Sequence, residues 1–224
     1  MRKNKRMAGM LFLGMIILGI IAQLTRSNVL TFDNNTNSLE EINNSLVILR
    51  ISFFSDILMV LFYLLTALTL YNILKNVNKT QSLLFFVLTI ISCSIMSMNM
   101  INHVSIIEIN SSEYINANNQ YDIRVLNQFF SQMHSYGYLI AQVFFGLWLL
   151  PLGNIIIKNK IMPKYFGIML IAAGFGSLLE VIVTFGFPKY GFIAYPGLII
   201  GMLGEFSFCF WLLFRGIEIE DKWK

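Results

Sequence analysis

Residues 50–74 read RISFFSDILMVLFYLLTALTLYNIL, and this stretch decides the fold. A helix of about 20 predominantly apolar residues is long enough to cross the hydrocarbon core of a bilayer. The stretch contains two charged side chains, Arg50 at its start and Asp56 inside it. A carboxylate near the bilayer centre costs about 2.5–3.5 kcal/mol on insertion scales, so its presence there usually indicates a function or a strong pairing partner.

Five further apolar stretches are also long enough to span a membrane. Hydrophobic residues make up 56% of the chain and charged residues 12%, against roughly 25% charged in soluble domains, which excludes a soluble enzyme. The apolar runs are continuous, whereas the strands of a membrane barrel alternate. The sequence therefore predicts an all-α membrane helix bundle, a single transmembrane domain over residues 1–224. Its six spans are predicted at about 7–25, 50–74, 82–102, 132–157, 165–186 and 196–214.

The distribution of basic residues predicts the orientation, because loops that face the cytoplasm are rich in Lys and Arg. Of the 16 basic residues, only Arg26, Arg50, Arg124 and Lys189 fall on one side of the predicted spans. Both termini are therefore expected in the cytoplasm and the protein in the cell (plasma) membrane. The long connections 26–49 and 103–131 are expected outside, either as ordered loops or as helical extensions of the spans. The net charge of +4 is compatible with a nucleic-acid partner, but none is expected, because the basic residues lie in short segments between apolar runs.

Two stretches near the C-terminus carry a family resemblance. Residues 134–153 read HSYGYLIAQVFFGLWLLPLG, and residues 204–216 read GEFSFCFWLLFRG. With these stretches the chain resembles, over nearly its whole length, a family of bacterial six-helix membrane proteins known only as a domain of unknown function (number 4386). The resemblance implies the fold and a membrane location, and it brings no biochemical activity with it. Pro151 lies within the fourth span and predicts a kink there.

The predicted topology places the costly polar residues between the bilayer midplane and the outer surface. Each also falls on a polar stripe of its helix. The sequence therefore predicts an outward-facing polar pocket between spans two to six, with Glu205 at its floor. The candidate residues for binding a ligand or a proton are Asp56, Glu180, Glu205, His134, Tyr138, Arg50, Asn99 and His103.

A purely structural interpretation of these residues stays open. Arg50 and Asp56 could form an ion pair, because long side chains can reach each other although a spacing of six positions puts them off a shared helix face. Each glutamate could be hydrogen-bonded to a neighbouring helix. The sequence favours an interfacial role for His103 over a role as a ligand, because His103 follows the end of the third predicted span.

Three functions compete at this point. The sequence favours binding or transport of a small molecule or ion. An intramembrane metal-dependent hydrolase is the alternative, with His134, Glu180, Glu205 and Asp56 as candidate ligands, and a non-catalytic partner or sensor subunit is another. No catalytic residue or cofactor is assigned, and the sequence favours a protein that is not an enzyme. The expected partners are the lipid bilayer, a small-molecule or ion ligand and a second copy of the chain.

Overall fold

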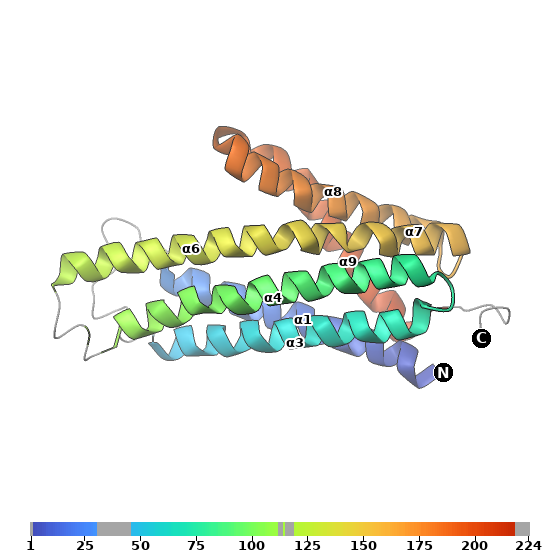
Figure 1. Ribbon diagram of the computed structural model, residues 1–224, viewed down its shortest axis with the longest axis horizontal. Coiled ribbons are helices and arrows are strands. Elements are labelled where there is room, and N and C mark those ends of the chain that lie inside the picture. The colour runs from blue at the N-terminus through green and yellow to red at the C-terminus, as the bar shows by residue number, and fades with distance from the viewer. Residues whose placement is uncertain (1, 31–45, 112–113, 115–118, 218–224) are drawn as a thin grey trace. The chain divides into compact units, whose positions relative to one another are not determined.

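The computed structural model describes residues 2–30, 46–111, 114 and 119–217, and every regular element in these ranges is helical (Figure 1). Six helical segments are long and apolar enough to cross a membrane. The protein is therefore a multi-pass membrane protein, which confirms the predicted all-α fold with six spans. In chain order the elements are α1 (Arg2–Leu30), α3 (Leu46–Leu74), α4 (Lys79–Ile109), α6 (Gln120–Leu147), α7 (Leu149–Asn159), α8 (Lys164–Gly186), the 3-10 helix η1 (Pro188–Ala194) and α9 (Tyr195–Phe214).

Helices take up part of both predicted outer connections, of which residues 31–45, 112–113 and 115–118 lie outside the described ranges. Helix α1 continues to Leu30, α4 continues to Ile109, and α6 begins at Gln120. The start of α6 has a local cause, since the side chain of Asn119 accepts a hydrogen bond of 3.0 Å from the backbone N–H of Asp122. This is the bond of a helix N-cap, which satisfies a backbone donor that has no partner inside the helix.

The fourth span consists of two helices, α6 and α7, with the break at Trp148. Pro151 explains the break. Its nitrogen carries no hydrogen, so the carbonyl of Leu147, four residues earlier, loses its partner within the helix. The helical hydrogen-bond ladder is thus interrupted one turn before the proline, at Trp148, whose own backbone stays helical, and the predicted kink stays a prediction.

Contacts divide the chain into two compact units. Unit 1 consists of Met1–Leu13, Phe62–Ser94 and Leu139–Lys224. An aromatic cluster lies at its core, where the ring of Trp148 packs edge-to-face against Phe12, Tyr63 and Phe85. Such edge-to-face pairs contribute about 0.5–1.5 kcal/mol each beyond the area they bury.

Glycines bring α7 and α8 of unit 1 into backbone contact. A Cβ added at Gly153 would lie 2.6 Å from the carbonyl oxygen of Gly167, and a Cβ added at Gly167 would lie 2.6 Å from that of Gly153. Gly146, near the end of α6, and Gly174 on α8 repeat this reciprocal contact at 2.7–2.9 Å. Inside a membrane the hydrophobic effect does not drive helices together. The close van der Waals packing that small residues permit stabilises such crossings instead.

Unit 2 consists of Gly14–Leu61 and Ile95–Tyr138, and so contains parts of α1, α3, α4 and α6. Its apolar core contains Leu49 and Ile106, both fully buried. Hydrogen bonds also join the helices of unit 2. The Ser52 hydroxyl of α3 donates to the carbonyl of Ala22 on α1 at 2.9 Å.

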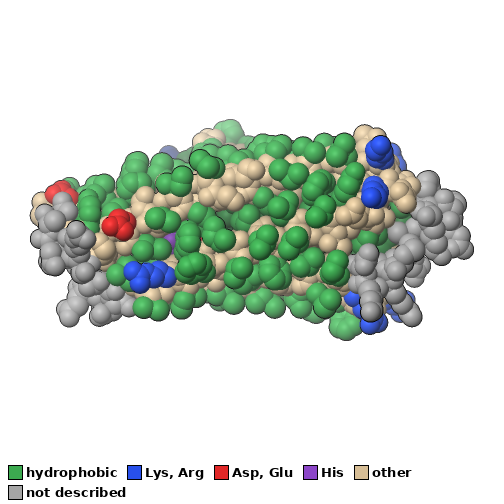
Figure 2. All heavy atoms as spheres, turned by 60° about the horizontal axis from the view of Figure 1, so that its bottom comes forward, with side chains coloured by type: hydrophobic (Ala, Val, Ile, Leu, Met, Phe, Trp, Pro, Cys, Tyr) green, Lys and Arg blue, Asp and Glu red, His purple; other side chains and the backbone are tan. Residues whose placement is uncertain are grey.

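Figure 2 shows one face of the molecule, on which hydrophobic side chains predominate and charged ones are few. This surface suits contact with lipid.

Candidate functional site

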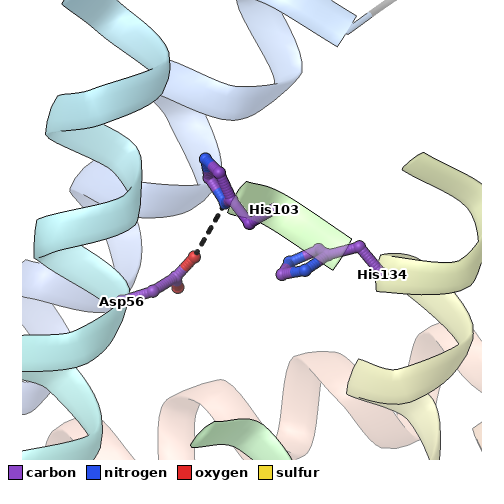
Figure 3. A group of neighbouring side chains, drawn as sticks. All are labelled: Asp56, His103 and His134. Carbon is purple, nitrogen blue, oxygen red and sulfur yellow. Dashed lines mark ion pairs between the residues drawn. The ribbon is translucent and has the colours of Figure 1, made fainter. Parts of the chain in front are cut away.

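Three side chains that can bind a metal ion meet inside unit 2. Asp56 on α3, His103 on α4 and His134 on α6 point toward one another (Figure 3). Each offers one ligand atom that lies within 4.8 Å of the other two. Their exposed fractions are 2%, 0% and 2%. Polar side chains buried to this degree require a compensating partner, so the partners of each residue decide what the cluster does.

A seven-residue spacing on two helices builds the histidine pair. Asn110 follows the last residue of α4 and lies seven positions after His103, and on α6 His134 lies seven positions after Asn127. The two asparagines exchange reciprocal side-chain hydrogen bonds of 2.7 and 3.1 Å. Seven residues are close to two helical turns, so this pairing brings the histidines together in the layer two turns away. Their ring centroids are 5.5 Å apart, and the ring planes are perpendicular.

The hydrogen bond of His103 determines which of its nitrogens can bind an ion. Its Nε2 lies 3.0 Å from the carbonyl oxygen of Leu49. A carbonyl oxygen only accepts, so Nε2 carries the hydrogen and donates it, and in the neutral ring the lone pair is on Nδ1. Within the described ranges this Nδ1 has no hydrogen-bond partner, and it lies 3.9 Å from Oδ2 of Asp56. A cation between these two groups satisfies both, and a backbone carbonyl on the other ring nitrogen is the usual outer support of a metal-binding histidine.

Among the described residues, His134 has no hydrogen-bond partner at either ring nitrogen, although both are buried. Its backbone, by contrast, is held in place, since the side-chain amide of Asn99 donates to the carbonyl of His134 at 2.8 Å. Asn99 reaches α6 because residue 137 is glycine, where an added Cβ would lie 2.1 Å from the Asn99 side-chain oxygen. An unsatisfied buried polar group costs about 1–3 kcal/mol, so the ring of His134 is poised for a partner that the protein itself does not supply.

Arg26 of α1 supplies the positive charge beside the cluster. Its Nη1 forms an ion pair of 2.5 Å with Oδ2 of Asp56, and its Nη2 donates to the side chain of Gln23 at 2.8 Å. The ion pair between Arg50 and Asp56, which the sequence leaves open as a structural alternative, is therefore not the one that forms. Arg50 is exposed on α3, and Arg26, which the sequence places in the outer connection, is the partner because α1 continues past it.

The structure gives mixed outcomes for the other predicted residues of unit 2. His103 is a fully buried member of the cluster, so the preferred interpretation of it as an interfacial residue is corrected. It is buried because α4 extends to Ile109, beyond the predicted end of the third span. Asn99 is a buried support of α6. Tyr138 lies on the exposed side of α6.

Glu180 and Glu205 belong to unit 1. The side-chain amide of Gln142 on α6 donates to the carboxylate of Glu180 on α8, and Glu180 is half-buried. Glu205 on α9 is half-buried too, and within the described part of the chain it makes no hydrogen bond or ion pair. The single pocket that combines these glutamates with Asp56 stays a prediction.

Sequence reasoning missed Arg26 and Gln142 as the partners of the two buried acids. The sequence contained a signal for Gln142, since this polar residue interrupts the apolar run of the fourth span. The spacing that pairs the histidines was also visible, but its use requires knowing that α4 and α6 are neighbours.

Comparison with known proteins places the chain among its relatives. The family model described as "Domain of unknown function (DUF4386)" matches residues 7–216, a range that includes the whole cluster. An uncharacterized protein of Archaeoglobus fulgidus is 25% identical over 155 residues, which cover 69% of this chain and 77% of that protein. No solved structure matches this chain.

Proposed function

The chain belongs to the DUF4386 family, and we propose that it is a membrane metalloprotein. Its metal would be a divalent transition-metal ion bound by Asp56, His103 and His134. The observation that carries this proposal is the set of three buried histidine nitrogens without a hydrogen-bond partner: Nδ1 of His103 and both ring nitrogens of His134. They converge with a buried carboxylate. A metal ion uses such lone pairs directly.

The donor set selects the class of ion. Two imidazole nitrogens and one carboxylate oxygen suit zinc or ferrous iron, whereas calcium and magnesium prefer oxygen ligands alone. In tetrahedral geometry two donors of one zinc ion are about 3.4 Å apart, since each lies about 2.0–2.2 Å from the metal. The donors of the cluster lie within 4.8 Å of one another. Binding therefore requires the donors to approach one another by up to roughly 1.4 Å, which the ring of His134 allows because it has no hydrogen bond to a described residue.

Three protein ligands are the number found in catalytic zinc sites, where a fourth position is kept for water or substrate. With the ion bound, Arg26 and the metal together carry three positive charges against the single negative charge of Asp56. The excess would favour an anionic fourth ligand, such as an oxygen of an anionic substrate. An ion held by Asp56, His103 and His134 would supply a Lewis acid that activates water, and the chemistry that this arrangement would support best is hydrolysis. In the overall reaction an acyl–oxygen or phosphorus–oxygen bond would break, the hydroxyl of the water would join the acyl or phosphoryl group, and the departing oxygen would take the other proton of the water.

The proposal is tested by metal analysis of the purified protein. After exposure to Zn²⁺, Fe²⁺, Mn²⁺ or Co²⁺ and removal of free ions, we expect about one zinc ion or one ferrous ion per chain. Tetrahedral Co²⁺ should also give visible absorption bands that report the coordination. His103→Ala and His134→Ala should each lower the affinity at least tenfold, in line with the loss of a ligand.

Ser92→Ala is the matched control, because Ser92 is buried on the same helix as His103 and is bonded to the carbonyl of Ala141 rather than to the cluster. It should leave the metal content unchanged. A folded wild-type protein without stoichiometric metal under all four ions would overturn the proposal.

A second candidate function, carriage of a small molecule or ion coupled to a proton, is favoured by the unpartnered carboxylate of Glu205. Intramembrane carboxylates are frequent proton-binding residues of transporters. Uptake into proteoliposomes should then depend on Glu205. Equal uptake by wild type, Glu205→Gln and Glu180→Gln would count against this function.

We also propose that the protein lies in the plasma membrane with both termini in the cytoplasm. The support is the bias of its basic residues, of which 12 of 16 are in segments that fall on one side of the alternating spans, as the positive-inside rule requires. A fluorescent protein fused to the C-terminus should mature in the cytoplasm, and a periplasmic alkaline phosphatase fused there should stay inactive. The opposite pattern would reverse the assignment.

A further inference from the structure

An apolar groove lies in unit 2, beside the histidine–aspartate cluster. Residues of α3, α4 and α6 line it, among them Phe53, Ile57, Met100, Val104, Leu126 and Phe130, and its volume is about 660 Å³. This volume falls in the range of about 300–1,000 Å³ typical of ligand pockets. Ile57 and Val104 are 37% and 46% exposed, so the groove opens onto the outer surface of membrane-spanning helices.

We propose that this groove binds one acyl chain of a membrane lipid that has an ammonium headgroup, such as phosphatidylethanolamine. Acyl chains surround the apolar outer faces of spanning helices, and an apolar lining offers them burial with few polar atoms to desolvate. Among the described residues that line the groove, Glu108 is the one charged side chain. It lies on the last turn of α4, where a spanning helix approaches the headgroup layer.

Charge complementarity selects the headgroup. Glu108 is exposed and forms no ion pair with a described residue, so its carboxylate is available to a cation at the end of the groove. An ammonium group provides that cation, whereas an anionic headgroup such as phosphatidylglycerol would be repelled. The preference for the amine-bearing lipid should therefore depend on the charge of Glu108.

Phe53 links the groove to the cluster. Its ring lines the groove and also packs edge-to-face on the ring of His103, with centroids 5.8 Å apart. One side chain thus lies between a bound acyl chain and a metal-binding histidine. This position of Phe53 indicates that the substrate of the proposed hydrolase is a lipid ester or phosphodiester. That assignment rests on the proposed metal centre, whereas the lipid site itself does not.

The test uses the full chain in vesicles that contain phosphatidylethanolamine with a photoactivatable acyl chain, followed by mass spectrometry of labelled peptides. We expect labels to concentrate on the groove residues of α4 and α6. Val104→Trp fills the groove and should lower this labelling at least fivefold. Met98→Trp is the matched control, because Met98 is exposed on the same helix and outside the groove lining, and it should change the labelling less than twofold.

The headgroup is tested by competition with unlabelled lipids. Phosphatidylethanolamine should displace the probe several-fold better than phosphatidylglycerol, and Glu108→Gln should abolish that preference. Asp122→Asn, an exposed acid on α6 outside the groove lining, should retain it. Labels spread evenly over all lipid-facing helices, or protein–protein crosslinks at the groove in their place, would overturn the proposal.

His103→Ala separates the two proposals. This variant should lose the metal ion and keep the labelled groove. Metal binding without groove labelling would overturn the lipid site alone, and groove labelling without metal in the wild type would overturn the metal centre alone.

Discussion

The two units of this protein bury polar groups in different ways. Among the described residues, the buried polar side chains of unit 1 are hydroxyls. Those of Thr66 and Thr89 donate to a carbonyl four residues earlier on their own helix, whereas that of Ser92 donates to the carbonyl of Ala141 on α6. Unit 2 buries a carboxylate, two imidazoles and three asparagine amides among the described residues, and several of their partners lie on other helices. A hydroxyl satisfied within its own helix adds no requirement for a neighbour, whereas a buried acid or imidazole does.

This difference indicates a division of labour. Unit 1 is held by glycine contacts and stacked rings, which need no charge and give close packing. Unit 2 carries buried groups that are expensive unless they are paired, and such groups persist in membrane helices mainly where they serve a function. Variants that remove charge should therefore act through unit 2, and variants that add volume should act through unit 1.

Removal of the counter-ion in unit 2 should have the largest effect. Arg26→Ala leaves Asp56 buried without its guanidinium, and loss of one partner of a buried pair costs about 3–5 kcal/mol. We expect a large fall in the thermal midpoint of the chelator-treated protein in detergent. Addition of Zn²⁺ should restore much of the loss, because the ion replaces the missing positive charge.

Arg124→Ala provides the comparison, since Arg124 is an exposed arginine of the same unit. It should change stability by no more than about 0.5 kcal/mol. Addition of Asp56→Asn to Arg26→Ala should recover stability without metal. Equal losses of stability in Arg26→Ala and Arg124→Ala would show that the ion pair of Arg26 with Asp56 does not stabilise unit 2.

The packing of unit 1 is tested by a methyl group at the α7–α8 crossing. Gly167→Ala places a Cβ 2.6 Å from the carbonyl oxygen of Gly153, and backbone atoms cannot rotate away as a side chain can. Overpacking of this kind costs about 1–3 kcal/mol. The variant should unfold at lower temperature than wild type, with the same metal content.

Gly186→Ala on the same helix is the control, because no atom lies within 4 Å of a Cβ added there. Its midpoint should equal that of wild type or exceed it slightly, since alanine favours helix over glycine. Equal loss in both variants would show that helix propensity, and not the crossing, determines the effect.

Much of the fold followed from the sequence, because a membrane span requires a minimum apolar length and this chain has six such stretches. Asp56 was also accessible to prediction, since its insertion cost alone identifies it. The partners of Asp56 were harder to predict. Arg26 and His103 lie at the polar ends of their apolar runs, where hydropathy places a boundary, but the helices continue for one or two turns more.

The pairing of the histidines required tertiary information. His103 and His134 meet because α4 and α6 pair in the register set by Asn110 and Asn127. A sequence shows the spacing on each helix, but it does not show which helices are neighbours. For this reason the pocket that groups Glu180 and Glu205 of unit 1 with Asp56 of unit 2 stays a prediction.

The asparagine pair should have a moderate effect on unit 2. Asn127→Ala removes one donor and one acceptor from Asn110, which is fully buried. Side-chain hydrogen bonds between membrane helices contribute about 0.6 kcal/mol on average and up to about 1.7 kcal/mol. We expect a loss in this range, together with weaker metal binding, because the register that positions the histidines is relaxed.

A double-mutant cycle separates this effect from general helix destabilisation. The combined Asn110→Ala and Asn127→Ala variant should lose less stability than the sum of the single variants, since the second substitution removes a group that the first has already left without its partner. Additive losses would show that the two amides act independently and do not fix the register.

The smallest effect is expected from neutralising the half-buried acid of unit 1. Glu180→Gln keeps the size of the side chain and an oxygen that accepts the hydrogen bond from Gln142, so the cost should stay near the 0.6 kcal/mol of an average interhelical bond. The metal content measured by mass spectrometry should not change, because the ion is expected in unit 2. Asp56→Asn, the equivalent change in unit 2, should by contrast remove most of the bound ion. A loss of metal in Glu180→Gln as large as that in Asp56→Asn would show that Glu180 helps to hold the ion, and the division of the buried charges between the two units would then fail at this residue.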